Sequence, residues 1–418
     1  MNAVSSEKGT FLGLRKDLVL GLIGVLLFIV GDGLEHAWIS PYLVDEGMSI
    51  QHTALLITIY GVAVTIGAWF SGVLAEAWGP RKTMLTGATF WLIGQFLFLT
   101  IALPSMNLAI MVPTYAIRGL GYPLFCYSFL VWVTYTNPQK TLGTAVGWFY
   151  LAFTGGLYIV ANYYASFMIP IIGHVGLLWS AMLWVVAGTT IVIIFVKGRM
   201  RESVDMKEQL KILLSGITIV KENPRVGLGG IVRMINSISQ FGLPVFFPTY
   251  LASYGFSTEK WLSIWATAFI VNIAFNLIFG IVGDKIGWRK TIMWFGGIGC
   301  GIVMIIMAYA PVIFGDNFVA MLLVGCLYGA ILAAFCPISA LLPSLEPEKR
   351  GSTMSILNLG AGLAAFAGPG IVGLFIGSLG AVGVLWIFAI LYFTSSILMI
   401  WVKSPSEKKV EKQETLIS

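Results

Sequence analysis

Three ionisable side chains, Asp32, Glu35 and His36, lie within five positions of an otherwise apolar stretch of the chain. Their spacing is i, i+3 and i+4, so on one helix all three would project from the same face. If that helix crosses a membrane, each acid costs about 2.5–3.5 kcal/mol at mid-depth, and such groups almost always face a protein interior or an aqueous cavity. The stretch is therefore predicted to belong to a functional site.

Arg118 is the predicted partner of these acids. Asp32 lies fourteen residues from the start of its apolar segment, and Arg118 lies ten residues from the start of a segment that runs the other way, so a rise of 1.5 Å per residue brings both near mid-depth. Pairing with Arg118 favours an ionised Asp32, whereas desolvation after the pair opens favours the protonated acid. Asp32, Glu35 and Arg118 are thus the predicted proton-coupling residues. A fixed structural ion pair and a solvated Glu35 are the alternatives.

The elements that position these residues are predicted to be membrane-spanning helices. Hydrophobic residues make up 58% of the 418 positions, charged residues only 11%, and the mean hydropathy is +0.89, whereas soluble domains contain roughly 25% charged residues. A spanning helix needs about 20 mostly apolar residues. Twelve segments qualify: 18–43, 52–75, 83–103, 108–135, 142–168, 174–196, 226–251, 260–282, 291–310, 317–342, 352–378 and 380–402. The first is expected to be retained, because the residues before it lack the pattern of a cleavable signal peptide.

The distribution of Lys and Arg predicts a multi-pass protein of the cell (inner) membrane with both termini in the cytoplasm. In this orientation 22 of the 25 basic residues are cytoplasmic, which accounts for the net charge of +6. No nucleic-acid partner is therefore predicted. The cysteines lie in apolar segments without paired ligand spacing, which argues against a disulfide framework or a metal site; they are Cys126, Cys300, Cys326 and Cys336.

The chain contains an internal repeat. At a shift of 208 residues, nine identities occur over the 42 positions from 42 to 83. The repeat predicts an all-α membrane protein of twelve helices in two six-helix bundles, related by an axis along the membrane normal, with a site between them. The predicted parts are an N-terminal bundle (1–196), a cytoplasmic linker with an amphipathic helix (197–225), a C-terminal bundle (226–403) and a cytoplasmic tail (404–418).

Two matching loops belong to this repeat, GVLAEAWGPRK at 72–82 and GIVGDKIGWRK at 280–290. Both resemble the cytoplasmic loop motif of the major facilitator superfamily, in which an acid follows four residues after a Gly and precedes a second Gly and a basic pair. The resemblance implies a conformational latch that holds helix ends together in one state and releases them in another. Its residues are Gly72, Glu76, Gly79, Arg81, Lys82, Gly280, Asp284, Gly287, Arg289 and Lys290. Ordinary positive-inside charges are the alternative.

Within this superfamily the stretches GDGLEHAWISPYLV, RGLGYPLFCYS and QFGLPVFFPTYL most resemble the polyol permeases, which transport ribitol and D-arabinitol. The resemblance implies a monomeric secondary transporter that works by alternating access in the lipid bilayer. Such a transporter is expected to need a proton gradient and no cofactor. The predicted function is proton-coupled symport of a small polyol. The same subgroup contains members assigned to 2-oxo acids, so symport of a small organic anion is the alternative, with Arg118 or Arg233 binding its carboxylate.

Neutral polar residues of the C-terminal half are predicted to bind the solute, since at the 208-residue shift Asp32 corresponds to Gln240 and Arg118 to Cys326. Amides and hydroxyls donate to and accept from a C–OH group, and aromatic rings can stack on a carbon skeleton. The predicted substrate-binding residues are His36, Trp38, Arg118, Tyr127, Arg233, Asn236, Gln240, Asn272, Asn276, Tyr328 and Asn358. Interhelical hydrogen bonds and interface anchoring are the alternative roles for the His, Asn, Trp and Tyr side chains.

An intramembrane enzyme using Asp32, Glu35 and His36 as catalytic groups is the alternative from another functional class. The duplication, the short external loops and the lack of an H-E-x-x-H or phosphate-binding Gly-rich motif argue against it. The chain is therefore predicted not to be an enzyme.

Overall fold

The computed structural model describes residues 10–11, 14–137, 139–195 and 218–403, which are almost entirely helical. Two strands of two residues each, β1 (Thr10–Phe11) and β2 (Leu14–Arg15), pair antiparallel directly before the first helix. Contacts divide the described residues into two units. The first unit holds the residues up to Glu35 and those from Ile66 to Phe195; the second holds His36–Thr65 and the residues from 218 onward.

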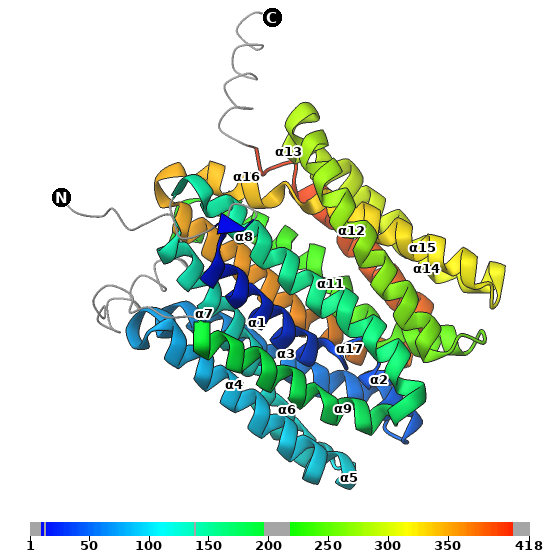
Figure 1. The fold of residues 1–418 in the computed structure, drawn as a ribbon. Helices are drawn as coiled ribbons and strands as arrows, with labels where there is room; N and C mark the ends of the chain where they lie inside the picture. The colour runs from blue at the N-terminus through cyan, green and yellow to red at the C-terminus, as the bar shows by residue number, and fades with distance from the viewer. Residues whose placement is uncertain (1–9, 12–13, 138, 196–217, 404–418) are drawn as a thin grey trace, which may run out of the picture. The chain divides into compact units, whose positions relative to one another are not determined.

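The first unit is a bundle of long helices, which Figure 1 shows in blue to green. Within it, α1 (Lys16–Gly33) packs along α9 (Ala161–Phe195), and α4 (Pro80–Leu97) packs against α6 (Leu108–Gly119) and α7 (Gly121–Thr136). The remaining elements are η1 (Phe98–Ala102), α5 (Leu103–Ser105), α8 (Gln139–Thr154) and η2 (Gly155–Val160). Glycines allow the close approach typical of membrane helices: a Cβ on Gly188 would lie 2.5 Å from the carbonyl oxygen of Gly24.

The second unit is built around α11 (Pro224–Ala252), which packs along α17 (Arg350–Leu398). A second pair consists of α12 (Thr258–Ile286) and α15 (Phe318–Leu332), and α14 (Cys300–Phe314) contacts both α15 and α17. Shorter elements complete the unit: α2 (Ile39–Asp45), α13 (Trp288–Thr291), η3 (Ile292–Gly299), η4 (Ala333–Phe335), α16 (Ile338–Leu345) and η5 (Pro347–Lys349). The long helix α3 (Ile50–Trp78) contributes residues 50–65 to this unit and 66–78 to the first.

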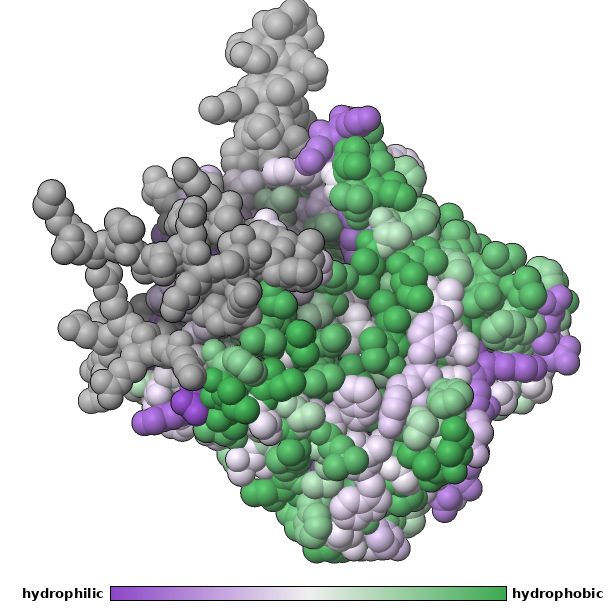
Figure 2. Space-filling view, in the orientation of Figure 1, coloured by the Kyte–Doolittle hydropathy of each residue, from purple (hydrophilic) through white to green (hydrophobic). Residues whose placement is uncertain are grey.

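Helices occur in the described chain at all twelve predicted segments. Eight helical stretches are long and apolar enough to cross a membrane, and two of them, Thr144–Phe195 and Thr353–Leu398, each hold two predicted segments. Backbone kinks at Gly173 (φ 71°) and Gly380 (φ 66°) separate the two halves of each stretch. Leucines at 183, 277 and 374 are 72–76% exposed, and hydrophobic residues cover most of the described surface seen in Figure 2. These are the surfaces of a multi-pass membrane protein.

The first predicted segment differs from the structure, because it is not one continuous helix over 18–43. The helix α1 ends at Gly33, residues 34–38 form a turn, and α2 begins at Ile39. Irregular backbone at membrane depth is tolerated where the protein buries it and supplies partners for its polar groups. The turn is largely buried, and the indole N–H of Trp261 donates to the carbonyl oxygen of Ala37 at 2.8 Å.

The repeat in sequence is accompanied by a repeat in backbone conformation. Gly79 and Gly287, which end α3 and α12, have φ of 89° and 100°. Gly47 and Gly255, another pair separated by 208 residues, have φ of 100° and 88°. Side chains other than Gly rarely adopt such φ values, so these four glycines are required by the turns that they form.

Two predicted parts fall largely or wholly outside the described residues: most of the amphipathic linker helix within 197–225, and the tail at 404–418. The predicted bundle boundaries at 1–196 and 226–403 stay predictions. The contact-based units differ from them in one respect, since residues 36–65 group with the later helices.

Candidate functional site

The two acids of α1 and the turn after it meet Arg118 of α6 inside the first unit. One guanidinium nitrogen of Arg118 (Nη1) contacts Glu35 Oε1 directly. The other (Nη2) donates to the backbone carbonyl of Asp32 at 3.1 Å and lies 3.7 Å from the Asp32 carboxylate. All three side chains are at most 4% exposed. Arg118 therefore has Glu35 as its close ion partner and Asp32 as a second, looser one.

Two aromatic residues complete this cluster, and sequence reasoning missed both. The hydroxyl of Tyr115 donates to Glu35 Oε1 at 2.5 Å, and the indole N–H of Trp91 donates to Asp32 Oδ1 at 2.7 Å. The Arg118 guanidinium carbon lies 4.8 Å from the centre of the Trp91 ring and 5.4 Å from that of Tyr115, within the range of cation–π attraction. Each acid thus has its own aromatic donor.

Glycines bring these helices close enough for those contacts. A Cβ on Gly94 of α4 would lie 2.6 Å from the backbone nitrogen of Arg118, and one on Gly121 would lie 2.5 Å from Trp91 Cβ. Gly121 belongs to the RGLGYP stretch that carried part of the family resemblance. On α4, Gly87, Trp91 and Gly94 recur at i, i+4 and i+7, the spacing of one helix face, and this is the signal that would have found Trp91.

The second oxygen of the Glu35 carboxylate, Oε2, is buried and has no hydrogen-bond partner among the described residues. Two carboxylates, Asp32 and Glu35, face one guanidinium, so the fully ionised cluster carries one excess negative charge. Buried charge of one sign is costly, and a single proton neutralises it. The arrangement can therefore hold one exchangeable proton.

His36 does not join the two acids on one face. Its ring hydrogen-bonds the backbone of Gln240 and meets Phe241 edge-to-face at 5.7 Å, both on α11 of the second unit. Trp38, also in the second unit, is fully buried and packs edge-to-face on Tyr42. Tyr127 lies in the first unit, stacked on Phe153 at 6.2 Å.

Helix α11 carries Arg233, Asn236 and Gln240, three predicted substrate-binding residues whose spacing of i, i+3 and i+7 makes them a polar stripe on one helix face. Arg233 is partly exposed, and its Nη1 donates to Asn236 Oδ1 at 2.5 Å; Gln240 is also partly exposed, whereas Asn236 is 3% exposed. A guanidinium has five N–H donors. One of them is given to Asn236, and Arg233 adds a positive charge to this stripe.

Two other predicted binding residues, Asn272 and Tyr328, join helices of the second unit through hydrogen bonds. Asn272 donates to the carbonyl of Gly329 at 2.9 Å, and Asn276 donates to Asn272 at 3.2 Å. The hydroxyl of Ser239 lies 2.8 Å from that of Tyr328 and 2.5 Å from that of Tyr392. Asn358 on α17 is exposed. The structure thus brings Asp32, Glu35 and Arg118 together in one cluster, and Arg233 and Asn236 in another.

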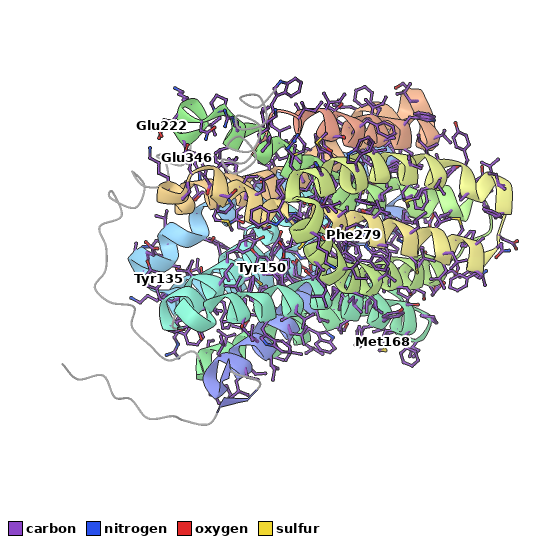
Figure 3. All side chains as sticks on the ribbon, turned by 90° about the horizontal axis from the view of Figure 1, so that it is seen from above. Tyr135, Tyr150, Met168, Glu222, Phe279 and Glu346 are labelled. Atoms are coloured by element: carbon purple, nitrogen blue, oxygen red, sulfur yellow. The ribbon has the colours of Figure 1, made fainter. Side chains whose placement is uncertain are left out.

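Each predicted latch acid, Glu76 and Asp284, accepts a hydrogen bond from an aromatic side chain. Tyr135, labelled in Figure 3, donates to Glu76 at 2.8 Å, and Trp288 donates to Asp284 at 2.8 Å. A Cβ on Gly72 or Gly280 would meet no described atom within 4 Å. Arg81, Lys82 and Lys290 are exposed, Arg289 is partly exposed, and Gly79 and Gly287 form the turns described above. The latch role of these residues stays a prediction.

A second set of polar contacts lies near the start of α11. Lys349 contacts Glu222 at 2.5 Å, and Asn223 donates to Glu346 at 2.8 Å; Figure 3 labels both acids. The Lys349 and Glu222 side chains are 52% and 53% exposed. The described part of the chain contains no group of three or more His, Cys, Asp or Glu side chains that could hold a metal ion, and its four cysteines form no disulfide.

Comparison with known proteins adds family evidence to this geometry. The family model described as Major Facilitator Superfamily matches residues 20–345 and 229–417. The alpha-ketoglutarate permease of Bacillus subtilis is 51% identical over 402 residues, covering 95% of this chain and 92% of that permease. The ribitol transporter of Klebsiella pneumoniae is 36% identical over 391 residues, covering 92% of both chains. The crystal structure of a D-xylose–proton symporter matches with a TM-score of 0.73 at 14% identity, covering 94% of this chain and 98% of that one, which is a likeness of fold.

Proposed function

We propose a cargo and a driving ion for this chain from the premise that it belongs to the major facilitator superfamily and is a secondary transporter of the membrane, not an enzyme. The predicted family and fold class are confirmed by the family match and by the structural likeness. The proposed function is symport of a small organic anion, such as a 2-oxo acid, together with protons. The short sequence motifs favour a polyol and leave such an anion as the alternative.

The observation that carries the anion proposal is the 51% identity to the alpha-ketoglutarate permease over 95% of the chain. The ribitol transporter shares only 36%, so the order of the two substrate classes is reversed. Arg233 supports the proposal chemically, because a guanidinium binds a carboxylate through two parallel N–H···O bonds. Its neighbours Asn236 and Gln240 supply amide groups that could accept from or donate to a second polar group of the anion.

Proton coupling is supported by the balance of charge around Arg118. Its two carboxylate neighbours exceed its charge by one, and the cluster is nearly inaccessible to solvent. Because the Glu35 carboxylate contacts Arg118 directly, whereas the Asp32 carboxylate lies 3.7 Å from it, Asp32 is the acid that a proton neutralises at lower cost. Asp32 is the proposed proton carrier and Glu35 the counter-ion that keeps Arg118 in place.

A polyol remains the second candidate, favoured by the ribitol transporter and by the neutral character of most polar groups in the second unit. Hydroxyls of a polyol would use the same amides as donors and acceptors. The two candidates differ most in how they would bind Arg233, because only an anion gains a charge-assisted hydrogen bond there.

The test is transport by the purified chain in proteoliposomes. Counterflow of labelled 2-oxoglutarate, pyruvate, ribitol and D-arabinitol would be compared, with external pH recorded during substrate-driven uptake. We expect counterflow with one or both carboxylates, alkalinisation of the medium as the anion enters, and little competition by pentitols. Counterflow with a pentitol that carboxylates do not inhibit would replace the anion by the polyol. Uptake of any cargo without proton movement would contradict the coupling.

A further inference from the structure

The side chain of Trp91 touches both partners of the looser ion pair, Asp32 and Arg118. Its indole N–H donates to Asp32 Oδ1 at 2.7 Å, and its ring lies 4.8 Å from the guanidinium carbon of Arg118. The Trp91 side chain is fully buried. It therefore meets the acid with its polar edge and the base with its aromatic face.

From this geometry we propose that Trp91 is a positioning residue, which holds Asp32 as the proton-accepting carboxylate of the cluster and leaves Glu35 as the ion partner of Arg118. The proposal rests on the proposed proton coupling and assigns the division of labour between the two acids. It adds a buried residue of α4, a helix whose predicted role was confined to the latch residues Arg81 and Lys82 at its start.

The hydrogen bonds of the cluster separate the two acids. Glu35 Oε1 receives donors from both Arg118 and Tyr115, and donors to a carboxylate favour its ionised form. Asp32 receives the neutral indole N–H, and Arg118 lies 3.7 Å away, beyond hydrogen-bond range. One proton entering the cluster is therefore expected on Asp32.

An indole suits this position because it can donate but cannot accept or exchange a proton under physiological conditions. Trp91 can keep its bond to Oδ1 while the other oxygen of Asp32 is protonated or ionised, so the carboxyl group stays oriented in both states. Packing fixes the indole itself. The ring of Phe28 meets it edge-to-face at 6.4 Å, and Gly121 leaves room beside its Cβ.

The charged and titratable groups around Asp32 come from three elements besides α1. Glu35 follows in the turn, Arg118 and Tyr115 come from α6, and Tyr122 and Cys126 come from α7. Trp91 faces Asp32 from α4 with a group that does not titrate. A change at Trp91 thus alters one donor to Asp32 without altering any charge.

The test is a pH titration of the carboxyl C=O infrared band, recorded on the full chain in liposomes without substrate. The variants are Asp32→Asn, Glu35→Gln and Trp91→Phe, with Trp386→Phe as the control. Trp386 also donates its indole N–H, to the hydroxyl of Tyr309 at 3.1 Å, and it belongs neither to the cluster nor to the turn that carries Glu35.

We expect one titrating buried carboxyl band that disappears in Asp32→Asn and persists in Glu35→Gln. In Trp91→Phe its midpoint should move to higher pH by about one unit, because the lost donor stabilised the ionised form. Trp386→Phe should titrate as the wild type does. A band that is lost in Glu35→Gln and kept in Asp32→Asn, or a Trp91→Phe midpoint equal to that of Trp386→Phe, would overturn the proposal. If the infrared results hold while no solute drives proton uptake, the proposed function fails and the assignment of the proton to Asp32 stands.

Discussion

The carboxylate of Glu35 is in direct contact with the guanidinium of Arg118, and both side chains are at most 3% exposed. From the sequence alone Asp32 is the predicted partner of Arg118, and a solvated Glu35 is an open alternative. A buried pair of this kind is weak evidence for stability, because desolvation offsets much of the attraction, but removal of one partner is costly. The following predictions separate its structural role from coupling and from substrate binding.

Glu35→Gln should lower the free energy of unfolding by about 1–3 kcal/mol, because Arg118 loses its closest counter-charge while the amide oxygen can still accept from Tyr115. The measurement is thermal unfolding in detergent. The matched control is Glu222→Gln, which breaks a half-exposed pair with Lys349 and should cost at most about 1 kcal/mol. Equal effects of the two substitutions would argue that burial of the Glu35 pair has no energetic consequence.

Arg233→Gln should weaken equilibrium binding of a 2-oxo acid by about one to two powers of ten, since a charge-assisted hydrogen bond contributes about 1.5–3 kcal/mol. Arg233→Lys keeps the charge, loses the bidentate geometry and should show a smaller loss. Isothermal titration of the folded variants measures both. Anion affinity that is unchanged in Arg233→Gln would remove Arg233 from the proposed site.

Gly94→Ala should destabilise the first unit by about 1–3 kcal/mol, because its Cβ would lie 2.6 Å from the backbone of Arg118 and force α4 and α6 apart. The control is Gly147→Ala on α8, where a Cβ meets no described atom within 4 Å; there Ala should be neutral or stabilising, by up to about 1 kcal/mol. Thermal unfolding compares the two. A Gly94→Ala protein as stable as Gly147→Ala would contradict the close packing of these helices.

Much of the fold was predictable because its signals are local. Long apolar segments and the 208-residue repeat can be read directly from the sequence, and the repeated glycines at 79 and 287 adopt matching positive φ values. The break after Gly33 was not predicted, since residues 34–38 contain no Pro and the turn depends on a partner from a distant helix, Trp261.

The candidate site was predicted in part for the same reason. Opposite charges in apolar segments are expected to pair, because an unpaired buried charge is costly. The positions of Asp32, Glu35 and Arg118 along their segments therefore sufficed to group them. Trp91 could not be distinguished by type among 14 tryptophans, because a Trp in a membrane helix can equally face lipid or an interface. The substrate was the least predictable feature. Amide and hydroxyl side chains hydrogen-bond polyols and oxo acids alike, so short motifs favoured the polyol whereas similarity over the whole chain favours the anion.

The most direct test of proton coupling at Asp32 compares uphill accumulation with counterflow in Asp32→Asn. Both would be measured in proteoliposomes with the cargo identified for the wild type. Asparagine keeps the shape of the side chain and can still accept from Trp91, but it cannot exchange a proton. The account predicts that the variant loses accumulation driven by a pH gradient and retains counterflow exchange. Accumulation to the wild-type level with a normal pH dependence would contradict it.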